Sequence, residues 1–347
     1  MRAIEYTRTG TPEVLTLVDR ETREPGAGEV RVRIAVSGVN PTDWKSRLGN
    51  GDGATLPVPQ VPNQDGAGVV DAVGAGVTSV AVGDRVWVWD AAFQRADGTA
   101  QELAIIPSEY VVRLPANSSL DEGASVGIPA LTAHRALTAR EDGPARLGVG
   151  TLTGVVILVA GGAGAVSHAA IQLAKWAGGI VITTVSSDEK GELARRAGAD
   201  HVINYRTEDV RTRVHELAPE GVAIIVEVNP SANIDLDLEV VARGGTISIY
   251  VGTTGEALPV PLRFAMGKNV RMQFILTYTT STEQKINGIE AVTAALADGA
   301  LSVGEDAGLP LIRFPLERTA DAHRAVEAGA VGKVLIDVAD LAGLGGR

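Results

Sequence analysis

Residues 155–178 read VVILVAGGAGAVSHAAIQLAKWAG, which is an apolar run, a group of small residues and a segment with helical periodicity. The apolar run predicts a buried strand and the last segment predicts a helix, so GGAGAVS (161–167) forms the junction between them. A backbone without bulky side chains can approach a diphosphate closely. The helix N-terminus adds unpaired N–H groups and a positive dipole end. The stretch therefore predicts a dinucleotide-binding loop.

The spacing within the junction is GxxGxxS, formed by Gly161, Gly164 and Ser167. The third glycine of such loops permits close packing of the helix on the strand, and a serine is small enough to do nearly the same. Ser167 is also a good N-cap residue, so packing, capping or both explain its presence. A glycine-rich turn alone is a weak signal, and its context in the chain decides its meaning.

That context is a series of strand-like and helical segments that alternate from residue 155 to about residue 250. The strand-like runs include IVITTV (180–185), HVINY (201–205), VAIIVEV (222–228) and GTISIYV (245–251). Repeated strand–helix units predict a parallel sheet covered by helices. The first 125 residues instead show short alternating runs separated by Gly, Pro and Asp, which predicts a β-rich unit. After residue 278, a helix, a strand, a short helix and a strand follow.

Composition excludes several classes of protein. The 347 residues include no cysteine, so disulfides, thiolate catalysis and cysteine-ligated zinc are ruled out. The net charge of −11 argues against broad contact with nucleic acid or with an anionic membrane. No run of about 18 apolar residues and no apolar block at the N-terminus is present, so we expect a cytoplasmic protein without a membrane span. The five histidines are scattered, and no GxSxG or HExxH motif supports a hydrolase.

Several motifs in order resemble the zinc-independent quinone oxidoreductases of the medium-chain dehydrogenase/reductase superfamily, and the zeta-crystallin branch above all. Besides the loop and its helix, they are SGVNPTDWKSRLG (37–49), NQDGAGVVDAVGAGVTSVAVGDRV (63–86), IPALTAHRAL (128–137) and RRAGADHVINYRTEDV (195–210). The resemblance implies an α/β chain with a GroES-like β-rich catalytic domain and a Rossmann domain whose parallel sheet is doubly wound. We expect the catalytic domain at residues 1–125 and 279–347, and the Rossmann domain at 126–278.

The presence or absence of a catalytic metal ion distinguishes the branches of this superfamily. Its alcohol dehydrogenases bind a catalytic zinc through a cysteine in the first motif and a histidine in GHExxG. In this chain Asn40 and Gln64 stand at those two positions, and neither supplies a thiolate or an imidazole. The resemblance therefore implies a zinc-free enzyme. Without a Lewis acid, reduction of an electrophilic π system is favoured over oxidation of a simple alcohol.

The candidate catalytic residues are Asn40, Asp43 and Lys45. The resemblance places Asn40 and Asp43 near the nicotinamide and the substrate; alternatively, they are turn residues around Pro41. Lys45 stands where zeta-crystallin-like members carry a tyrosine. It is either a donor to a developing oxyanion or an exposed charge on a short helix. Thr132 corresponds to a residue below the cofactor ring, or is a buried hydroxyl at a helix start.

NADPH is the expected cofactor. NAD-specific folds place an acid at the end of the second strand, whereas IVITTV runs into Ser186 and Ser187. We expect these serines and Lys190 to surround a 2′-phosphate, and the resemblance to bacterial quinone oxidoreductases places Tyr205 beside it. Asp188 and Glu189 are the contrary observation, since either could imitate the NAD-specific acid. Tyr205 could also be a core tyrosine at a strand end.

The remaining cofactor contacts include Gly161 and Gly164, which the loop itself indicates, and residues that only the resemblance implies. They are Asn40, Thr132, Gly161, Ala163, Gly164, Ala165, Val166, Asn229, Val251, Gly252, Leu276, Tyr278 and Lys333. The implied substrate is a small quinone, with an enone or enoyl acceptor as the alternative. A crystallin-like protein that binds NADPH with little turnover is the alternative of another class. The apolar run VRMQFILTY (270–278) predicts an edge strand and a homodimer.

Overall fold

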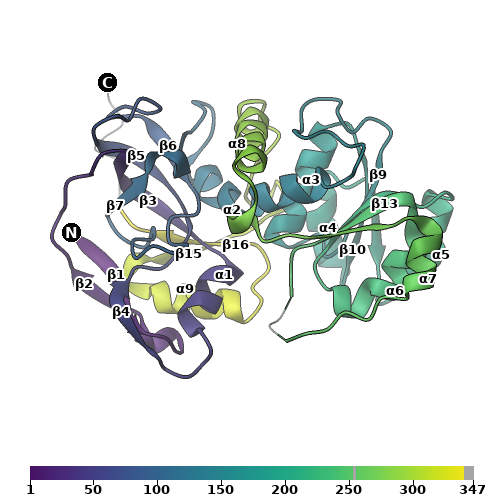
Figure 1. Cartoon of the computed structure of the whole chain (residues 1–347), viewed down its shortest axis with the longest axis horizontal. Helices are drawn as coiled ribbons and strands as arrows, with labels where there is room; N and C mark the ends of the chain where they lie inside the picture. Colours follow the sequence, from purple (N-terminus) through teal and green to yellow (C-terminus); the bar gives the residue numbers. More distant parts are fainter. Residues whose placement is uncertain (253–254, 340–347) are drawn as a thin grey trace. The chain divides into compact units, whose positions relative to one another are not determined.

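The computed structural model describes residues 1–252 and 255–339. The chain divides into two compact units, coloured along the sequence in Figure 1. The first unit comprises residues 1–128 together with the described residues from Leu311 onward, and the second comprises Pro129–Pro310. The chain is thus mixed α/β, as predicted. The last eight residues of the predicted segment 279–347 lie outside the described residues.

Two sheets form the first unit. A three-stranded sheet has the order β2-β1-β4, and a seven-stranded sheet has the order β15-β16-β3-β5-β6-β8 with β7 paired to β3. The strands are β1 (Arg2–Arg8), β2 (Thr16–Asp19), β3 (Glu29–Val39), β4 (Thr55–Gln60), β5 (Asp65–Val73), β6 (Arg85–Val88), β7 (Leu103–Pro107), β8 (Val111–Arg113), β15 (Leu311–Pro315) and β16 (Lys333–Asp337). This is the predicted GroES-like β-rich unit.

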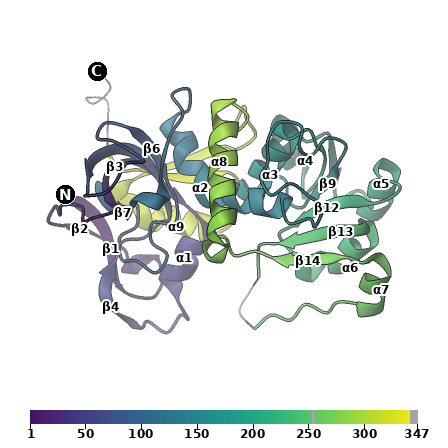
Figure 2. The same cartoon turned by 45° about the horizontal axis from the view of Figure 1, so that its top comes forward.

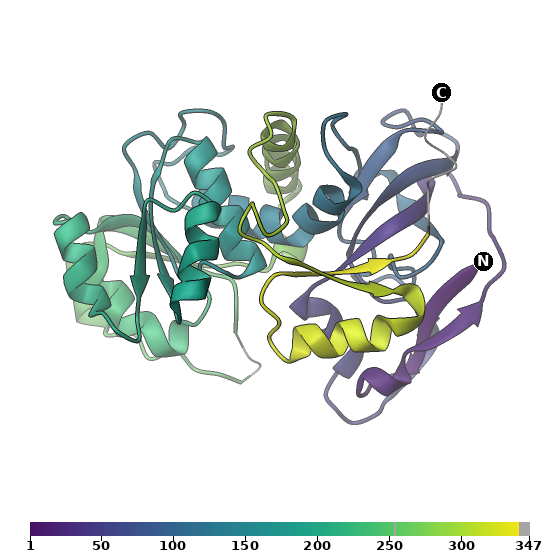
Figure 3. The ribbon, with the colours of Figure 1, turned by 180° about the vertical axis from the view of Figure 1, so that it is seen from behind.

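Strand β16 joins the two ends of the chain within this unit. It pairs antiparallel with β3, with Val334 opposite Val39. Helix α9 (Thr319–Glu327) packs beside it, and the helix α1 (Pro41–Leu48) directly follows β3. In Figure 3 the yellow C-terminal strands and helix lie beside the purple N-terminal strands. The C-terminal segment therefore completes a sheet that the N-terminal segment begins.

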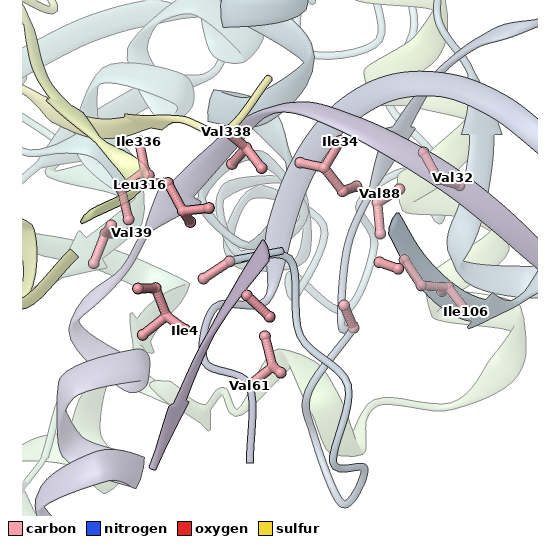
Figure 4. Packing of buried hydrophobic residues seen from close by; sticks show 14 of the residues in the cluster. Ile4, Val32, Ile34, Val39, Val61, Val88, Ile106, Leu316, Ile336 and Val338 are labelled. Carbon is pink, nitrogen blue, oxygen red and sulfur yellow. The ribbon is translucent and has the colours of Figure 1, made fainter. Parts of the chain in front are cut away.

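The core of the first unit consists of aliphatic side chains from both segments. Figure 4 shows them pointing toward one another, among them Ile34, Ile106, Leu316 and Ile336. Each of these four is at most 1% exposed. The alternation along β3 that predicted a strand supplies this core, because its inward residues Val30, Val32 and Ile34 are fully buried.

The second unit is built on a six-stranded parallel sheet in the order β11-β10-β9-β12-β13-β14. Figure 2 shows β12, β13 and β14 side by side. The strands are β9 (Val156–Val159), β10 (Ile180–Val185), β11 (His201–Asn204), β12 (Val222–Glu227), β13 (Val241–Ile249) and β14 (Arg271–Phe274). The helices are α3 (Ala165–Trp176), α4 (Asp188–Arg196), α5 (Val210–Leu217), α6 (Pro230–Val240), α7 (Leu262–Lys268) and α8 (Thr282–Ala297). The chain reverses direction across the sheet after β11, as in a Rossmann domain.

The second unit extends beyond residue 278, where the sequence placed the end of the Rossmann domain. Helix α8 belongs to it, and Gly288 of α8 lies so near α2 (Leu120–Leu137) that a Cβ there would be 3.0 Å from Leu131. Helix α8 thus packs on a helix that is distant in the chain. The boundary between the two units therefore lies after residue 310 and not at residue 278, where the local sequence pattern changes. In the described part of the chain no helix is long and apolar enough to span a bilayer.

Candidate functional site

The loop of the second unit connects β9 to α3. Gly161 has a φ of 67°, a left-handed conformation that glycine adopts without strain, and it forms the tight turn after the strand. Gly164 is exposed at the N-cap of α3. Ala163 is buried, whereas Ala165 and Val166 begin the helix half-buried. The N–H groups of this first helical turn lack intrahelical acceptors, which suits an anion.

The two central glycines of the loop, Gly162 and Gly164, lack a side chain for different structural reasons. A Cβ at Gly162 would lie 2.3 Å from Oγ1 of Thr183 in β10, so side-chain packing excludes a larger residue. A Cβ at Gly164 would meet nothing closer than 3.5 Å. Packing within the chain therefore does not explain Gly164. The absence of a side chain leaves the backbone at Gly164 open to close approach.

Ser167 ties α3 to the end of β9. Its Oγ donates to the carbonyl of Ala160 at 2.8 Å and lies 3.3 Å from the hydroxyl of Tyr250, and the residue is 1% exposed. The N-cap of α3 is Gly164, so the capping explanation for Ser167 is wrong. The serine instead combines close packing with a hydrogen bond that a glycine could not make.

The four residues predicted to surround a 2′-phosphate lie at the ends of two neighbouring strands. Nζ of Lys190 donates to Oγ of Ser186 at 3.0 Å, and Ser187 caps α4. Tyr205 follows β11, and its N–H donates to the carbonyl of Val185 at the end of β10. The tyrosine is 52% exposed, so it is not a core tyrosine.

The acids next to these serines belong to the first turn of α4, where carboxylates complement the helix dipole. Oδ1 of Asp188 accepts a hydrogen bond from Nδ2 of Asn204 at 3.0 Å. Glu189 is exposed. Neither acid therefore terminates β10 in the manner of an NAD-specific carboxylate.

The ends of β12 and β13 hold further predicted residues and an unpredicted acid pair. Asn229, Val251 and Gly252 are exposed just beyond these strands. The carboxylate of Glu227 accepts hydrogen bonds from the N–H of Asn229 and from Nδ2 of Asn233. Burial, followed by the neighbouring Glu227, raises the pKa of Asp237 to about 9. The two buried acids thus share a proton at neutral pH.

Thr132 lies in the second unit's part of α2. Its Oγ1 is 2.5 Å from Oγ1 of Thr277, and both residues are buried. Thr277 stands between Leu276, which is exposed, and Tyr278, which is buried. Three of the predicted cofactor residues are therefore gathered around one hydroxyl pair.

A separate polar cluster lies inside the first unit. Asn40 is the N-cap of α1, and its N–H donates to Oδ2 of Asp43 at 2.6 Å. Both residues are 3% exposed. The turn around Pro41 is therefore a helix start whose two polar side chains point into the protein.

Asp65 and Lys333 complete this cluster, which we call the amide clamp: Asn40, Asp65 and Lys333. Nδ2 of Asn40 donates to Oδ2 of Asp65 at 2.6 Å, and Nζ of Lys333 donates to Oδ1 of Asn40 at 2.8 Å. Nζ of Lys333 lies 3.7 Å from Oδ2 of Asp65. The sequence predicted Lys333 as a cofactor contact but missed Asp65, although Asp65 follows the Gln64 that drew attention to the same motif.

Burial dominates the titration of this region. Burial, helped by nearby Asp65, raises the pKa of Asp43 to about 8, against the opposing effects of the Asn40 N–H and of Lys333. Burial also raises the pKa of Asp65 and lowers that of Lys333, and in both cases the opposite charge opposes the effect. The raised pKa of Asp43 favours its neutral form, which leaves Asp65 as the acid that faces Lys333.

Lys45 does not join this cluster. Its side chain is exposed on α1, with Nζ 5.8 Å from the ring centroid of Trp44. Gln64 is buried, and its Oε1 accepts the N–H of Ala92 at 2.9 Å. Of the three candidate catalytic residues, Asn40 and Asp43 are therefore buried, and Lys45 is exposed.

The two positions at which related dehydrogenases carry zinc ligands do not fit a zinc ion. The amide oxygens of Asn40 and Gln64 are already hydrogen-bonded, by an ammonium and by a backbone N–H. Among the residues that the structure describes, no three His, Asp or Glu side chains gather as a metal site would require.

Sequence comparison agrees with the division into a β-rich and a dinucleotide-binding part. The alcohol dehydrogenase GroES-like domain family matches residues 26–116, and the zinc-binding dehydrogenase family matches residues 165–293. Human quinone oxidoreductase is 30% identical over 342 residues, which cover 97% of each chain.

Solved structures give the same picture. A NAD-dependent alcohol dehydrogenase superimposes with a TM-score of 0.83 at 28% identity, covering 98% of this chain and all of that one. The quinone oxidoreductase of Escherichia coli, complexed with NADPH, superimposes with a TM-score of 0.79 at 26% identity and covers 97% and 100%. The two neighbours differ in cofactor and in substrate class, so the choice between them depends on this chain's own residues.

Proposed function

Because the chain belongs to the quinone oxidoreductases of the medium-chain dehydrogenase/reductase superfamily, we propose that it transfers a hydride from NADPH to a quinone. The observation that carries this proposal is the chemistry of Asn40 and Gln64. Two hydrogen-bonded amides replace the zinc ligands of related alcohol dehydrogenases. Loss of a Lewis acid disfavours alcohol oxidation and leaves reduction of activated π systems.

The nucleotide is held by the second unit. Gly161, Ala163, Gly164, Ala165 and Val166 receive the diphosphate at the N-terminus of α3. Asn229, Val251 and Gly252 follow the next two strands, and Thr132, Leu276 and Tyr278 form the third group of contacts. When bound, the reduced nicotinamide supplies the hydride.

Selectivity for NADPH over NADH resides in Ser186, Ser187, Lys190 and Tyr205. The hydroxyl groups and the ammonium are suited to a phosphate. Support comes from the first turn of α4, where Asp188 is engaged by Asn204. An acid directed at the ribose would instead favour NAD.

The protein works without zinc. We expect activity to survive incubation with a chelator, and elemental analysis to find less than one zinc per chain. Stoichiometric zinc, together with loss of activity on its removal, would contradict this part of the proposal.

Catalysis needs a placed acceptor and a proton. Asn40 offers amide groups to the nicotinamide carboxamide or to the acceptor oxygen, and Asp43 is a neutral acid beside it. Lys45 stays a candidate donor to a developing oxyanion, because its ammonium is exposed. An enone or enoyl acceptor requires the same groups and is the second candidate.

The native assembly is a homodimer joined through β14. This strand ends the order of the sheet, and Phe274 and Leu276 expose apolar side chains beside it. An unpaired apolar edge favours pairing with its copy.

The test is a panel of quinones, enones and enoyl thioesters assayed with NADPH. We expect the largest kcat/KM for a quinone. A larger value for an enone would favour the alkene reductase, and no turnover with the whole panel would favour a crystallin-like protein.

A further inference from the structure

Both polar atoms of the Asn40 side-chain amide are bound by buried charges. Oδ1 accepts from the Lys333 ammonium at 2.8 Å, and Nδ2 donates to the Asp65 carboxylate at 2.6 Å. The exposed fractions of Asn40, Asp65 and Lys333 are 3%, 0% and 1%. A flipped amide would place its NH₂ against the ammonium and its oxygen against the carboxylate. The amide clamp therefore allows one orientation.

The register of three strands builds the clamp. Asn40 follows the last residue of β3, Asp65 begins β5 opposite Gly38 of β3, and Lys333 begins β16 next to the pair formed by Val334 and Val39. Asp65 is fixed further, because its Oδ1 accepts the N–H of Ile128 at 2.9 Å. The three side chains thus project from backbone segments at the ends of strands that sheet hydrogen bonds hold in place.

Two glycines let the backbone close around these charges. A Cβ at Gly38 would lie 2.1 Å from the carbonyl oxygen of Ala124 and 3.2 Å from Nζ of Lys333, and a Cβ at Gly127 would lie 2.2 Å from Oδ1 of Asp65. These positions exclude any side chain and hold the two charged groups close to the main chain.

Stability alone does not account for the arrangement. A buried ion pair gains little over apolar residues of the same volume, because both charges lose their hydration. An amide has two donor hydrogens and two acceptor lone pairs, and the clamp uses one of each. The capping box of α1 also directs the N–H of Asp43 to the Asn40 side chain, so one N–H of the Asn40 amide is left, in a fixed direction.

We propose that Asp65 and Lys333 are positioning residues, which hold the amide of Asn40 in the single orientation that binds the nicotinamide or the acceptor. Lys333 then acts through Asn40, which stands at one of the two positions of the metal ligands, rather than by touching the cofactor. The inference rests on the proposed reductase function. Asp43 supports it, since a carboxyl that is neutral at pH 7 leaves the lysine with a single counter-charge.

The first test compares Lys333→Met, Asp65→Asn and the double variant with the wild type. Each single variant leaves one buried charge without its partner, so we expect a Tm lowered by several degrees and a kcat lowered about 10- to 100-fold. The double variant removes both charges. It should regain most of the Tm but not the kcat, because the amide is no longer held.

The matched control is Lys175→Met, which removes a lysine that pairs with Asp200 at 2.8 Å on the surface. The side chains of Lys175 and Asp200 are each 34% exposed, so we expect little change in Tm or kcat. If a single clamp variant does not fold, the Tm and kcat of the neutral double variant, compared with those of the wild type, test the proposal. Recovery of Tm and kcat together in the double variant would show a structural role only and would overturn the proposal.

The second test needs neither cofactor nor turnover. The side-chain amide signals of Asn40, identified by their absence in Asn40→Asp, should show slow hydrogen exchange in the wild type and fast exchange in Lys333→Met. Unchanged signals with an active wild type would overturn the inference alone. A wild type that never oxidises NADPH would overturn the proposed function and the positioning role together, while these signals still report whether the clamp exists.

Discussion

Nζ of Lys190 lies 3.0 Å from Oγ of Ser186, the residue that directly follows the end of β10. The ammonium is thereby held at the strand end where a dinucleotide's adenosine ribose is recognised in Rossmann domains. We expect Lys190→Ala to lower kcat/KM for NADPH about 10- to 100-fold and to leave NADH almost unaffected. Loss of one charged phosphate contact, about 1.5 to 3 kcal/mol, is the reason.

The matched control is Arg196→Ala, which removes a cation from the last turn of the same helix, where it pairs with Glu192. It should change neither cofactor's kinetics. An equal loss for both cofactors in Lys190→Ala would show that the four residues do not form a phosphate pocket.

Gly162 and Gly164 provide a matched pair within one loop. Gly162→Ala forces a methyl group to within 2.3 Å of Thr183 Oγ1, so we expect the free energy of unfolding to fall by about 1–3 kcal/mol. Gly164→Ala has room, and its φ of −84° suits alanine, so the change in stability should stay within about 0.5 kcal/mol. Its affinity for NADPH, measured by titration of cofactor fluorescence, should nevertheless fall about tenfold or more because the methyl group blocks close approach. Unchanged affinity in Gly164→Ala would move the diphosphate away from this loop.

Asp237 gives the folded state a specific dependence on pH. Its pKa is about 9 in the folded chain against an ordinary value of 3.8, so between these values the folded state holds a proton that the unfolded state has lost. The free energy of unfolding therefore decreases as pH rises, by up to about 1.4 kcal/mol per pH unit from this group. Asp237→Asn keeps a donor toward Glu227 and removes that slope, so the variant should exceed the wild type in stability at pH 8.

Urea denaturation between pH 5 and pH 9 measures this difference, and exposed Asp235→Asn on the same helix is the control. Three buried histidines with lowered pKa values, His134, His168 and His323, shift the stability of both proteins in the opposite direction at low pH. They cancel in the comparison. Parallel curves for the wild type and Asp237→Asn would refute the shared proton.

The dimer prediction concerns the edge of the parallel sheet. Phe274 at the end of β14 is 63% exposed, and Val82 in the first unit is equally exposed. Light scattering at micromolar concentration should find a dimer for the wild type and for Val82→Lys, and a monomer for Phe274→Lys. A monomeric wild type would count against pairing through β14.

Local patterns predicted the second unit well, because each of its strand–helix segments carries its own periodicity. The loop at residues 161–167 and the strand ends at Ser186 and Tyr205 follow from such patterns together with the order of a parallel sheet. The sequence does not decide between packing and capping for Ser167, because that choice depends on the position of Gly164 at the N-cap.

The amide clamp could not be read from local patterns. Lys333 and Asn40 are 293 residues apart, and the register of β16 against β3 brings them together. Asp65 adjoins them through a second strand pair. Glu227 and Asp237 were missed for the same reason, since an acid in a strand and an acid in a helix give no signal until α6 packs on β12. The division after residue 310 likewise depends on the packing of α8.

The central claim is hydride transfer from NADPH to a quinone without a metal. Its most direct measurement is the steady-state rate of NADPH oxidation with a simple quinone, on protein freed of metal by a chelator and checked by elemental analysis. The account predicts saturable turnover at the untreated rate, with a kcat/KM at least about tenfold lower for NADH. No turnover of NADPH by the metal-free protein, restored on addition of zinc, would contradict it.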